Sequence, residues 1–236
     1  LQRFADASGF RRFYREHRAT YDAQAAFFRD TAGVEQGRAW LARSFAPRAP
    51  FDLLTVVFSP LVGDSASAAT PQSGGFVELQ SHVGFSHAEK YQGDELRGLP
   101  DETVALYRRN APLARIQRAY FLGEASKYAE RILWGVSNRK HWVDPARGPD
   151  YYPGTSAFSE YLTWALIELR LAETAPEAER ARVAESVERL MMARGFPQYP
   201  ALSRFIMPLY RDRRAGQTVA DLFPDIVGWF EDNNGW

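Results

Sequence analysis

The chain has 236 residues, of which 45% are hydrophobic and 14% aromatic, and this composition excludes an intrinsically disordered protein. Acidic and basic residues number 29 each, so no overall field attracts the chain to nucleic acid or to an anionic membrane. The absence of cysteine excludes disulfides, thiolate catalysis and cysteine-based zinc sites, while leaving the compartment open.

Residues 8–30 are predicted to form one helix with an apolar face. Ser8 is expected to cap its N-terminus, and His17, which falls within the apolar face, is interpreted as a core histidine rather than a metal ligand. The face consists of side chains that recur at three- and four-residue steps: Phe10, Phe13, Tyr14, His17, Tyr21, Ala25 and Phe28. A shorter helix is predicted over residues 34–44.

Two strands are predicted next, over residues 51–59 and 76–85, with a loop over residues 63–75 between them. In the second strand Val77, Leu79 and Val83 would share one face, and Glu78, Gln80 and His82 the other. His82 and His87 are five residues apart, a spacing available to a metal site at the end of a strand. Exposed histidines without a metal are the simpler interpretation, because no carboxylate follows at a fixed offset.

The remainder of the chain is predicted to be helical. Expected helices cover residues 102–110, 113–133, 156–172, 177–194 and 222–230, with Pro112 separating the first two and a capping box at residues 174–177. Residues 138–154, which include His141, are expected to form a loop. Residues 197–216 are expected to be irregular apart from a turn or two of helix within residues 202–210. With no internal repeat and no linker, the sequence predicts one α+β domain over residues 1–236. Its N-terminal helices and small β-sheet would occupy residues 1–97, and its helical half residues 98–236.

The longest strongly apolar run, residues 53–58, is too short to span a bilayer. The sequence begins with Leu1 rather than methionine, so we expect the natural chain to start earlier. A signal peptide could lie in such an upstream segment.

One motif has the frame of a metal-binding helix. The run Gly123-Glu124-Ala125-Ser126-Lys127 matches the metallopeptidase pattern H-E-x-x-H with both histidines replaced. In an intact motif the two imidazoles lie on one helix face and hold zinc, while the glutamate activates its water. By itself, a glutamate three residues before a lysine is an ordinary surface pair.

The order of several short blocks along the chain favours the metallopeptidase interpretation of this motif over the surface pair. The blocks are Phe13-Tyr14-Arg15-Glu16-His17, Phe58-Ser59-Pro60-Leu61-Val62-Gly63, the Glu124 helix, Phe158-Ser159-Glu160-Tyr161-Leu162, Arg194-Gly195-Phe196 and Phe223-Pro224-Asp225-Ile226-Val227. This succession resembles an uncharacterised bacterial family of zincin-like domains of the gluzincin type. The resemblance implies a mainly helical zincin-like domain with a small β-sheet.

The resemblance also implies roles for four residues. Glu124 falls on the general base, Glu160 on the downstream carboxylate ligand, and Gly123 and Lys127 on the two histidines. Since a catalytic zinc needs about three protein ligands, this set implies that neither a metal nor another cofactor is bound. We hypothesise that the Lys127 ammonium replaces the metal between Glu124 and Glu160; the alternative is that it points to solvent.

The resemblance therefore implies a non-catalytic zincin-like domain that acts as a peptide- or protein-binding module, without nucleic-acid partners. Relatives of this kind are often exported. Two alternatives stay open at this stage. One is an active metal-dependent hydrolase with a relocated site, built from His82, His87 or His141 with Glu124 or Glu160. The other is a structural or interaction domain unrelated to zincins.

Overall fold

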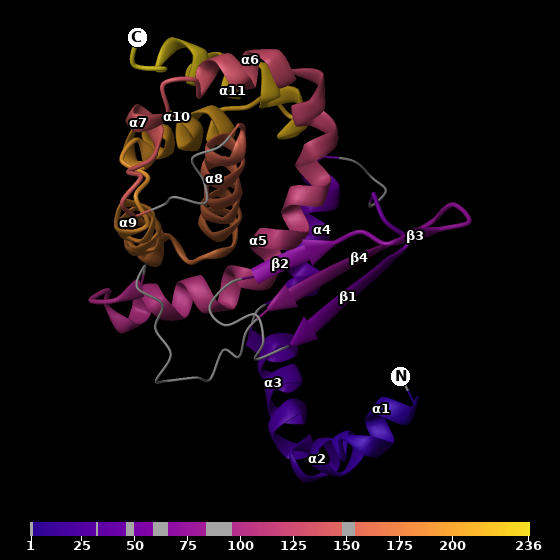
Figure 1. Cartoon of the computed structure of the whole chain (residues 1–236). Coiled ribbons are helices and arrows are strands. Elements are labelled where there is room, and N and C mark those ends of the chain that lie inside the picture. The colour runs from indigo at the N-terminus through magenta and orange to yellow at the C-terminus, as the bar shows by residue number, and fades with distance from the viewer. Residues whose placement is uncertain (1, 32, 46–49, 59–65, 84–95, 148–153) are drawn as a thin grey trace.

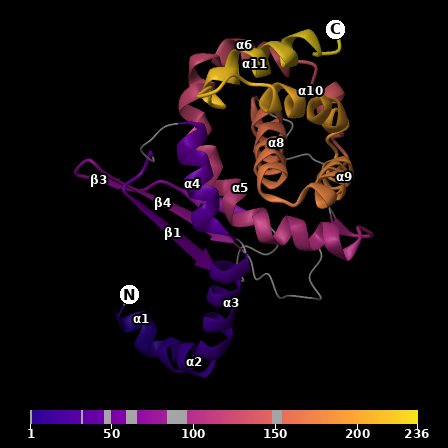
Figure 2. The ribbon, with the colours of Figure 1, turned by 180° about the vertical axis from the view of Figure 1, so that it is seen from behind.

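The computed structural model describes residues 2–31, 33–45, 50–58, 66–83, 96–147 and 154–236. The fold is α+β and mainly helical, with one small mixed sheet, as the sequence predicted. A helical body lies beside the sheet, and a curved arm formed by the first three helices extends away from both (Figures 1 and 2). The division into a single domain stays a prediction.

The sheet is built around β4 (Phe76–Val83). Strand β1 (Leu53–Phe58) pairs with it in parallel, while β2 (Ala66–Ala69) and β3 (Gln72–Ser73) pair with it antiparallel. The predicted alternation along β4 is confirmed, since its even-numbered side chains from 78 to 82 are half-buried and Leu79 and Val83 are fully buried. The buried face of β4 packs towards the helical body.

The loop predicted over residues 63–75 is wrong for residues 66–69 and 72–73, which form β2 and β3; residues 63–65 lie outside the described part. The sequence Ala-Ser-Ala-Ala has little intrinsic strand preference, so β2 exists because β4 offers it a hydrogen-bonding edge. Gly74 and Gly75 connect β3 to β4 with φ angles of 57° and 82°. Two consecutive positive φ angles are typical of the type I′ turn, which suits a two-residue hairpin.

Helix α8 (Ser156–Thr174) lies at the centre of the helical body (Figure 1). All of its residues from Ala157 to Leu169 are buried, which is the pattern of a helix surrounded by protein on every side. The surrounding elements are α4 (Val34–Ser44), α5 (Asp101–Lys127), α6 (Ala129–Gly135), α7 (Arg139–Trp142), α9 (Glu177–Ala193), α10 (Tyr199–Arg211), η4 (Ala220–Leu222) and α11 (Phe223–Asp232). Aromatic rings supply much of the core; Trp142, for example, contacts the rings of Tyr161 and Phe230.

A carboxylate also lies within this core. Glu168 of α8 is fully buried, and its two oxygens accept hydrogen bonds from Tyr199 Oη at 2.9 Å and Ser203 Oγ at 2.7 Å, both on α10. Burial raises the pKa of Glu168 to about 7, because these two hydroxyl donors offset only part of the lost hydration. The structure therefore contains a carboxyl group that changes charge near neutral pH.

Helix α5 is longer than predicted, because it continues through Pro112. A proline inside a helix costs about 3 kcal/mol through its missing N–H and its clash with the preceding turn. Buried residues on both sides, including Leu113 and Ile116, hold the helix in the core and outweigh this cost. The helix is visibly bent within its length (Figure 1), as expected for a proline kink. The predicted helix 113–133 is interrupted instead at Tyr128, between α5 and α6.

The N-terminal arm differs most from the prediction. The expected helix 8–30 is divided into α1 (Gln2–Ala7), α2 (Phe10–Glu16) and α3 (Arg18–Thr31). Gly9, with φ 66°, occupies the N-cap position expected for Ser8, and α2 buries none of its residues. His17 is exposed and stacks on Phe13 with ring centroids 4.0 Å apart, so its interpretation as a core histidine is wrong.

Other elements differ less. The helix over residues 34–44 is confirmed as α4. Residues 197–216 were predicted to be irregular apart from a turn or two of helix within residues 202–210, but residues 199–211 form all of α10. The predicted capping box is wrong, because Pro176 occupies the N-cap of α9 and Thr174 Oγ1 bonds back to Arg170 O. In the described part of the chain, every helix is too short or too polar to cross a bilayer.

Candidate functional site

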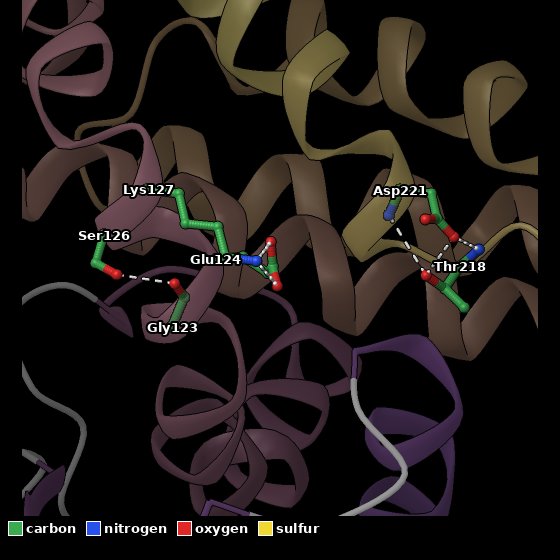
Figure 3. A network of polar contacts seen from close by, with 6 residues as sticks. All are labelled: Gly123, Glu124, Ser126, Lys127, Thr218 and Asp221. Atoms are coloured by element: carbon green, nitrogen blue, oxygen red, sulfur yellow. Dashed lines mark hydrogen bonds and ion pairs between the residues drawn. The ribbon is translucent and has the colours of Figure 1, made fainter.

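Glu124 and Lys127 form an ion pair at the C-terminal end of α5 (Figure 3). Lys127 Nζ lies 2.7 Å and 2.9 Å from the two carboxylate oxygens, and 61% of the lysine side chain is exposed. The hydrogen bond from Lys127 to Glu124 raises the pKa of the lysine. A lysine in the last turn also complements the negative end of the helix dipole. These are the properties of a solvated surface pair.

Gly123 gives no sign of a constrained site. It is exposed, and a Cβ added to it would meet nothing within 4 Å. Its carbonyl accepts a hydrogen bond from Ser126 Oγ at 2.8 Å. The position expected for the first zinc ligand is therefore open surface of α5.

Glu160 lies in the core rather than at an open cleft. Its Oε1 accepts hydrogen bonds from Arg194 Nη1 at 2.8 Å and Trp164 Nε1 at 3.0 Å. Only 5% of the glutamate side chain and 1% of the arginine side chain are exposed. Burial by itself would raise the pKa of Glu160, but the charge of Arg194, supported by Arg115 and Arg118, holds it below its ordinary value.

Aromatic rings enclose the arginine of this buried pair. The Arg194 guanidinium lies 5.6 Å from the ring centroid of Tyr107, 5.7 Å from that of Trp164 and 5.6 Å from that of Phe196. The rings interact favourably with the cation while keeping water out. The Glu160–Arg194 pair thus joins α8 to the end of α9 as a structural element of the core.

The hypothesis that Lys127 bridges Glu124 and Glu160 is wrong. Lys127 is solvated and paired with Glu124 alone among the described residues, whereas Glu160 is neutralised by Arg194. The physical reason is burial: an ammonium with most of its surface in water cannot also contact a carboxylate enclosed in the core. The alternative that Lys127 points to solvent agrees with the structure.

The candidate histidines are placed on separate elements. His82 lies on β4 between Val57 and Ser67 of the neighbouring strands, while His141 lies on α7, against Gly235 and the edge of Trp142. Strand β4 and helix α7 are in different parts of the fold (Figure 1). His87 lies outside the described residues. Within the described ranges, no group of three or more histidine, aspartate and glutamate side chains is arranged to hold a metal ion.

A groove that the sequence did not reveal lies beside the C-terminal end of α8. It consists of two adjoining pockets of about 420 Å³ and 460 Å³, which share Glu173, Tyr210 and Arg213 in their linings. Pockets of this size accommodate small ligands or a few residues of a peptide. We call this region the Tyr210 groove.

The centre of the Tyr210 groove is a fixed polar cluster. Glu173 Oε2 accepts hydrogen bonds from Tyr210 Oη at 2.6 Å and Trp40 Nε1 at 2.9 Å. Partial burial would raise the pKa of Glu173, but these two donors, with Arg43 3.8 Å away, hold it below its ordinary value. Burial, followed by the bond to this carboxylate, raises the pKa of Tyr210 to about 12, so its hydroxyl stays protonated.

Arginines surround this cluster. The Arg213 guanidinium lies 3.7 Å from the centroid of the Tyr210 ring and donates to Tyr210 O at 2.6 Å. The loop after α10 is fixed by Thr218, which bonds to Asp221 Oδ2 through both its N–H and its hydroxyl (Figure 3). Five arginines and one carboxylate, Glu173, line the two pockets: Arg43, Arg180, Arg211, Arg213 and Arg214. Arg211 already pairs with the neighbouring Asp212 at 2.7 Å, which leaves four arginines against Glu173. The groove can therefore attract a negatively charged ligand.

Sequence reasoning missed this groove because four separated segments supply its walls. A partial signal was present in the run Arg211-Asp212-Arg213-Arg214, which places three arginines at and just after the C-terminal end of α10. Nothing in the sequence indicated that Trp40 of α4 and Glu173 of α8 would meet there.

Comparisons with known proteins add no further assignment. No family model matches the chain, no curated protein matches it, and no solved structure matches it. The relationship to zincin-like domains therefore stays a prediction.

Proposed function

We propose that this chain is a non-catalytic binding domain that holds an acidic segment of a peptide or protein in the Tyr210 groove. The observation that carries the proposal is the excess of arginines over carboxylates around one ordered Tyr–Glu–Trp cluster. Arginine clusters recognise carboxylates through paired, charge-assisted hydrogen bonds.

The shape of the groove favours a peptide over a single small anion. The second pocket adds apolar walls from Leu169, Met207 and Pro208 to the arginine-lined first pocket. An extended segment with acidic and apolar side chains would contact both kinds of wall, whereas a free anion would use the arginines alone. Acidic side chains would pair with the partly exposed arginines, and apolar ones would cover the second pocket.

The environments of the two vestigial carboxylates support the non-catalytic part of the proposal. Glu124 is engaged by Lys127, and Glu160 is engaged by Arg194 in the core, so each already has a cationic partner. The zincin-like origin of the fold belongs to the proposal as a prediction from the order of the sequence blocks. The relocated hydrolase has no specific observation in its favour.

The test is a binding measurement with short fluorescent peptides. An acidic peptide with interspersed leucines should bind, while the same peptide with lysine in place of glutamate should not. Arg43→Ala and Arg214→Ala should each weaken binding about tenfold, since a hydrogen bond between charged groups is worth about 1.5–3 kcal/mol. Equal affinity of the acidic and basic peptides would overturn the proposal.

A matched control is Arg182→Ala. Arg182 is an exposed arginine, with 70% of its side chain accessible, and it pairs with Glu102 outside the groove. Its loss should leave the affinity unchanged. Cleavage of the peptide by metal-loaded protein would contradict the non-catalytic assignment, whatever the affinities.

A further inference from the structure

The N-terminal arm presents an aromatic face that nothing in the described structure covers. Phe10 is 51% exposed, Phe13 48% and Tyr14 47%. Their rings are ordered along the arm, since Phe10 stacks on Tyr14 at 6.3 Å and Tyr14 stacks on Tyr21 at 5.3 Å. The spacing of three and four residues places Phe10, Phe13 and Tyr14 on one side of α2. Exposed contiguous aromatic surface of this kind marks an interaction site.

The same segment is basic, although the whole chain is neutral. Residues 10–18 contain four arginines and one glutamate, a formal charge of +3. Arg11 and Arg15 are four residues apart and share a face next to the aromatic one. Two of the arginines have weak ion pairs at the ends of the segment, Arg11 with Asp6 at 3.6 Å and Arg18 with Asp22 at 3.4 Å, and all four side chains are exposed.

We propose that this arm binds the surface of an anionic lipid bilayer, with its aromatic face in the interface and its arginines at the headgroups. An amphipathic helix of this type lies in the plane of the membrane, where apolar burial and attraction to anionic lipid act together. Arginine side chains beside the aromatic face are long enough to reach the headgroups while their stems stay in apolar surroundings. The arm projects away from the helical body (Figures 1 and 2), so the body does not obstruct the approach to a flat surface.

Two other occupants fit the observations less well. A second copy of the chain, packed arm against arm, would bring two segments of charge +3 together, which is unfavourable. Single-stranded nucleic acid needs open ring faces on which bases can stack. In the arm the rings already stack on one another, with Phe13 and His17 at 4.0 Å.

The experiment is co-sedimentation of the whole chain with vesicles. Vesicles of phosphatidylcholine with 30% phosphatidylserine should bind the chain, and vesicles of phosphatidylcholine alone should bind it at least tenfold more weakly. Adding 0.5 M NaCl should reduce binding, because salt screens the headgroup charges. Equal partition into both kinds of vesicle, or partition into neither, would overturn the proposal.

Variants separate the arm from the rest of the surface. The double change Phe10→Ala with Phe13→Ala should lower partition at least tenfold, because two aromatic rings would no longer be buried in the interface. Arg12→Gln should lower it about fivefold. Phe76→Ala is the matched control, because Phe76 is 47% exposed but lies on β4, and it should leave partition unchanged.

The competing occupants give different outcomes. Dimerisation that depends on Phe13 without vesicle binding would overturn the proposal in favour of a second copy. Binding of a single-stranded oligonucleotide without binding to the anionic vesicles would overturn it in favour of nucleic acid. Because all arm variants leave the Tyr210 groove intact, peptide binding should persist in each of them. A failure of the membrane proposal can therefore be distinguished from a failure of the peptide-binding proposal.

Discussion

Replacing the buried carboxyl of Glu168 with an amide should stabilise the protein above neutral pH. In the unfolded chain this group has the ordinary glutamate pKa of 4.5, and burial raises its pKa to about 7 in the folded protein. Between these two values the folded state keeps a proton that the unfolded state releases. The contribution of Glu168 to stability is therefore fully present below pH 4.5 and is lost as the pH rises towards 7.

The size of the effect follows from the two pKa values. One pKa unit corresponds to about 1.4 kcal/mol, so the ionised Glu168 should lower the free energy of unfolding at pH 8 by about 3 kcal/mol. A glutamine at this position would stay neutral at every pH. Its amide can still bond with Tyr199 Oη and Ser203 Oγ, because both hydroxyls act as donors or acceptors. We expect Glu168→Gln to raise stability at pH 8 by up to about 3 kcal/mol and to change it little at pH 5.

The assay is urea unfolding of both proteins at intervals from pH 5 to pH 8. Taking the difference between the two proteins cancels the contribution of every other titrating group. Glu185→Gln serves as a control, because Glu185 is 66% exposed on α9 and pairs with Arg189 at the surface. A stability difference for Glu168→Gln that is the same at pH 5 and pH 8 would refute the reasoning.

Four further substitutions test the environments described above, each by urea unfolding at pH 7. Glu160→Gln leaves Arg194 buried without a counter-charge and should cost about 3–5 kcal/mol; a loss below about 1 kcal/mol would show that the pair is solvated. Lys127→Met should leave the unfolding midpoint nearly unchanged, because its ion pair is exposed, and a large loss would restore the bridging hypothesis. Gly37→Ala should cost about 1–3 kcal/mol, since the new methyl would overlap the buried side chain of Leu113 on α5. Gly123→Ala, with nothing within 4 Å, should instead stabilise α5 by up to about 1 kcal/mol, and equal effects of the two glycine changes would contradict the packing.

Local sequence patterns predicted an element correctly where the burial of its side chains in the fold matches the pattern. Alternation identified β4, and apolar residues at helical spacing identified α8, because each pattern reflects which sides of the element are buried. Periodicity does not say whether anything covers the apolar side. The aromatic face of residues 10–21 has the spacing of a buried helix face, yet Phe13 is about half exposed.

Long-range pairing explains why the candidate site was predicted poorly. The partner of Glu160 is Arg194, 34 residues later, and only the packing of α9 against α8 brings the two together. In the same way, packing on both sides of α5 overrides the local preference of Pro112 to end a helix. A sequence motif of five residues contains no information about either arrangement.

The hydrogen bond from Trp40 to Glu173 joins parts of the chain that are 133 residues apart. Helix α4 also buries Leu41 against the helical body, so it belongs structurally to the C-terminal elements despite its early place in the sequence. A recombinant fragment that started after α4 would expose this apolar surface and leave the Glu173 carboxylate with one donor fewer. The smallest autonomously folding unit of this protein should therefore begin no later than Val34.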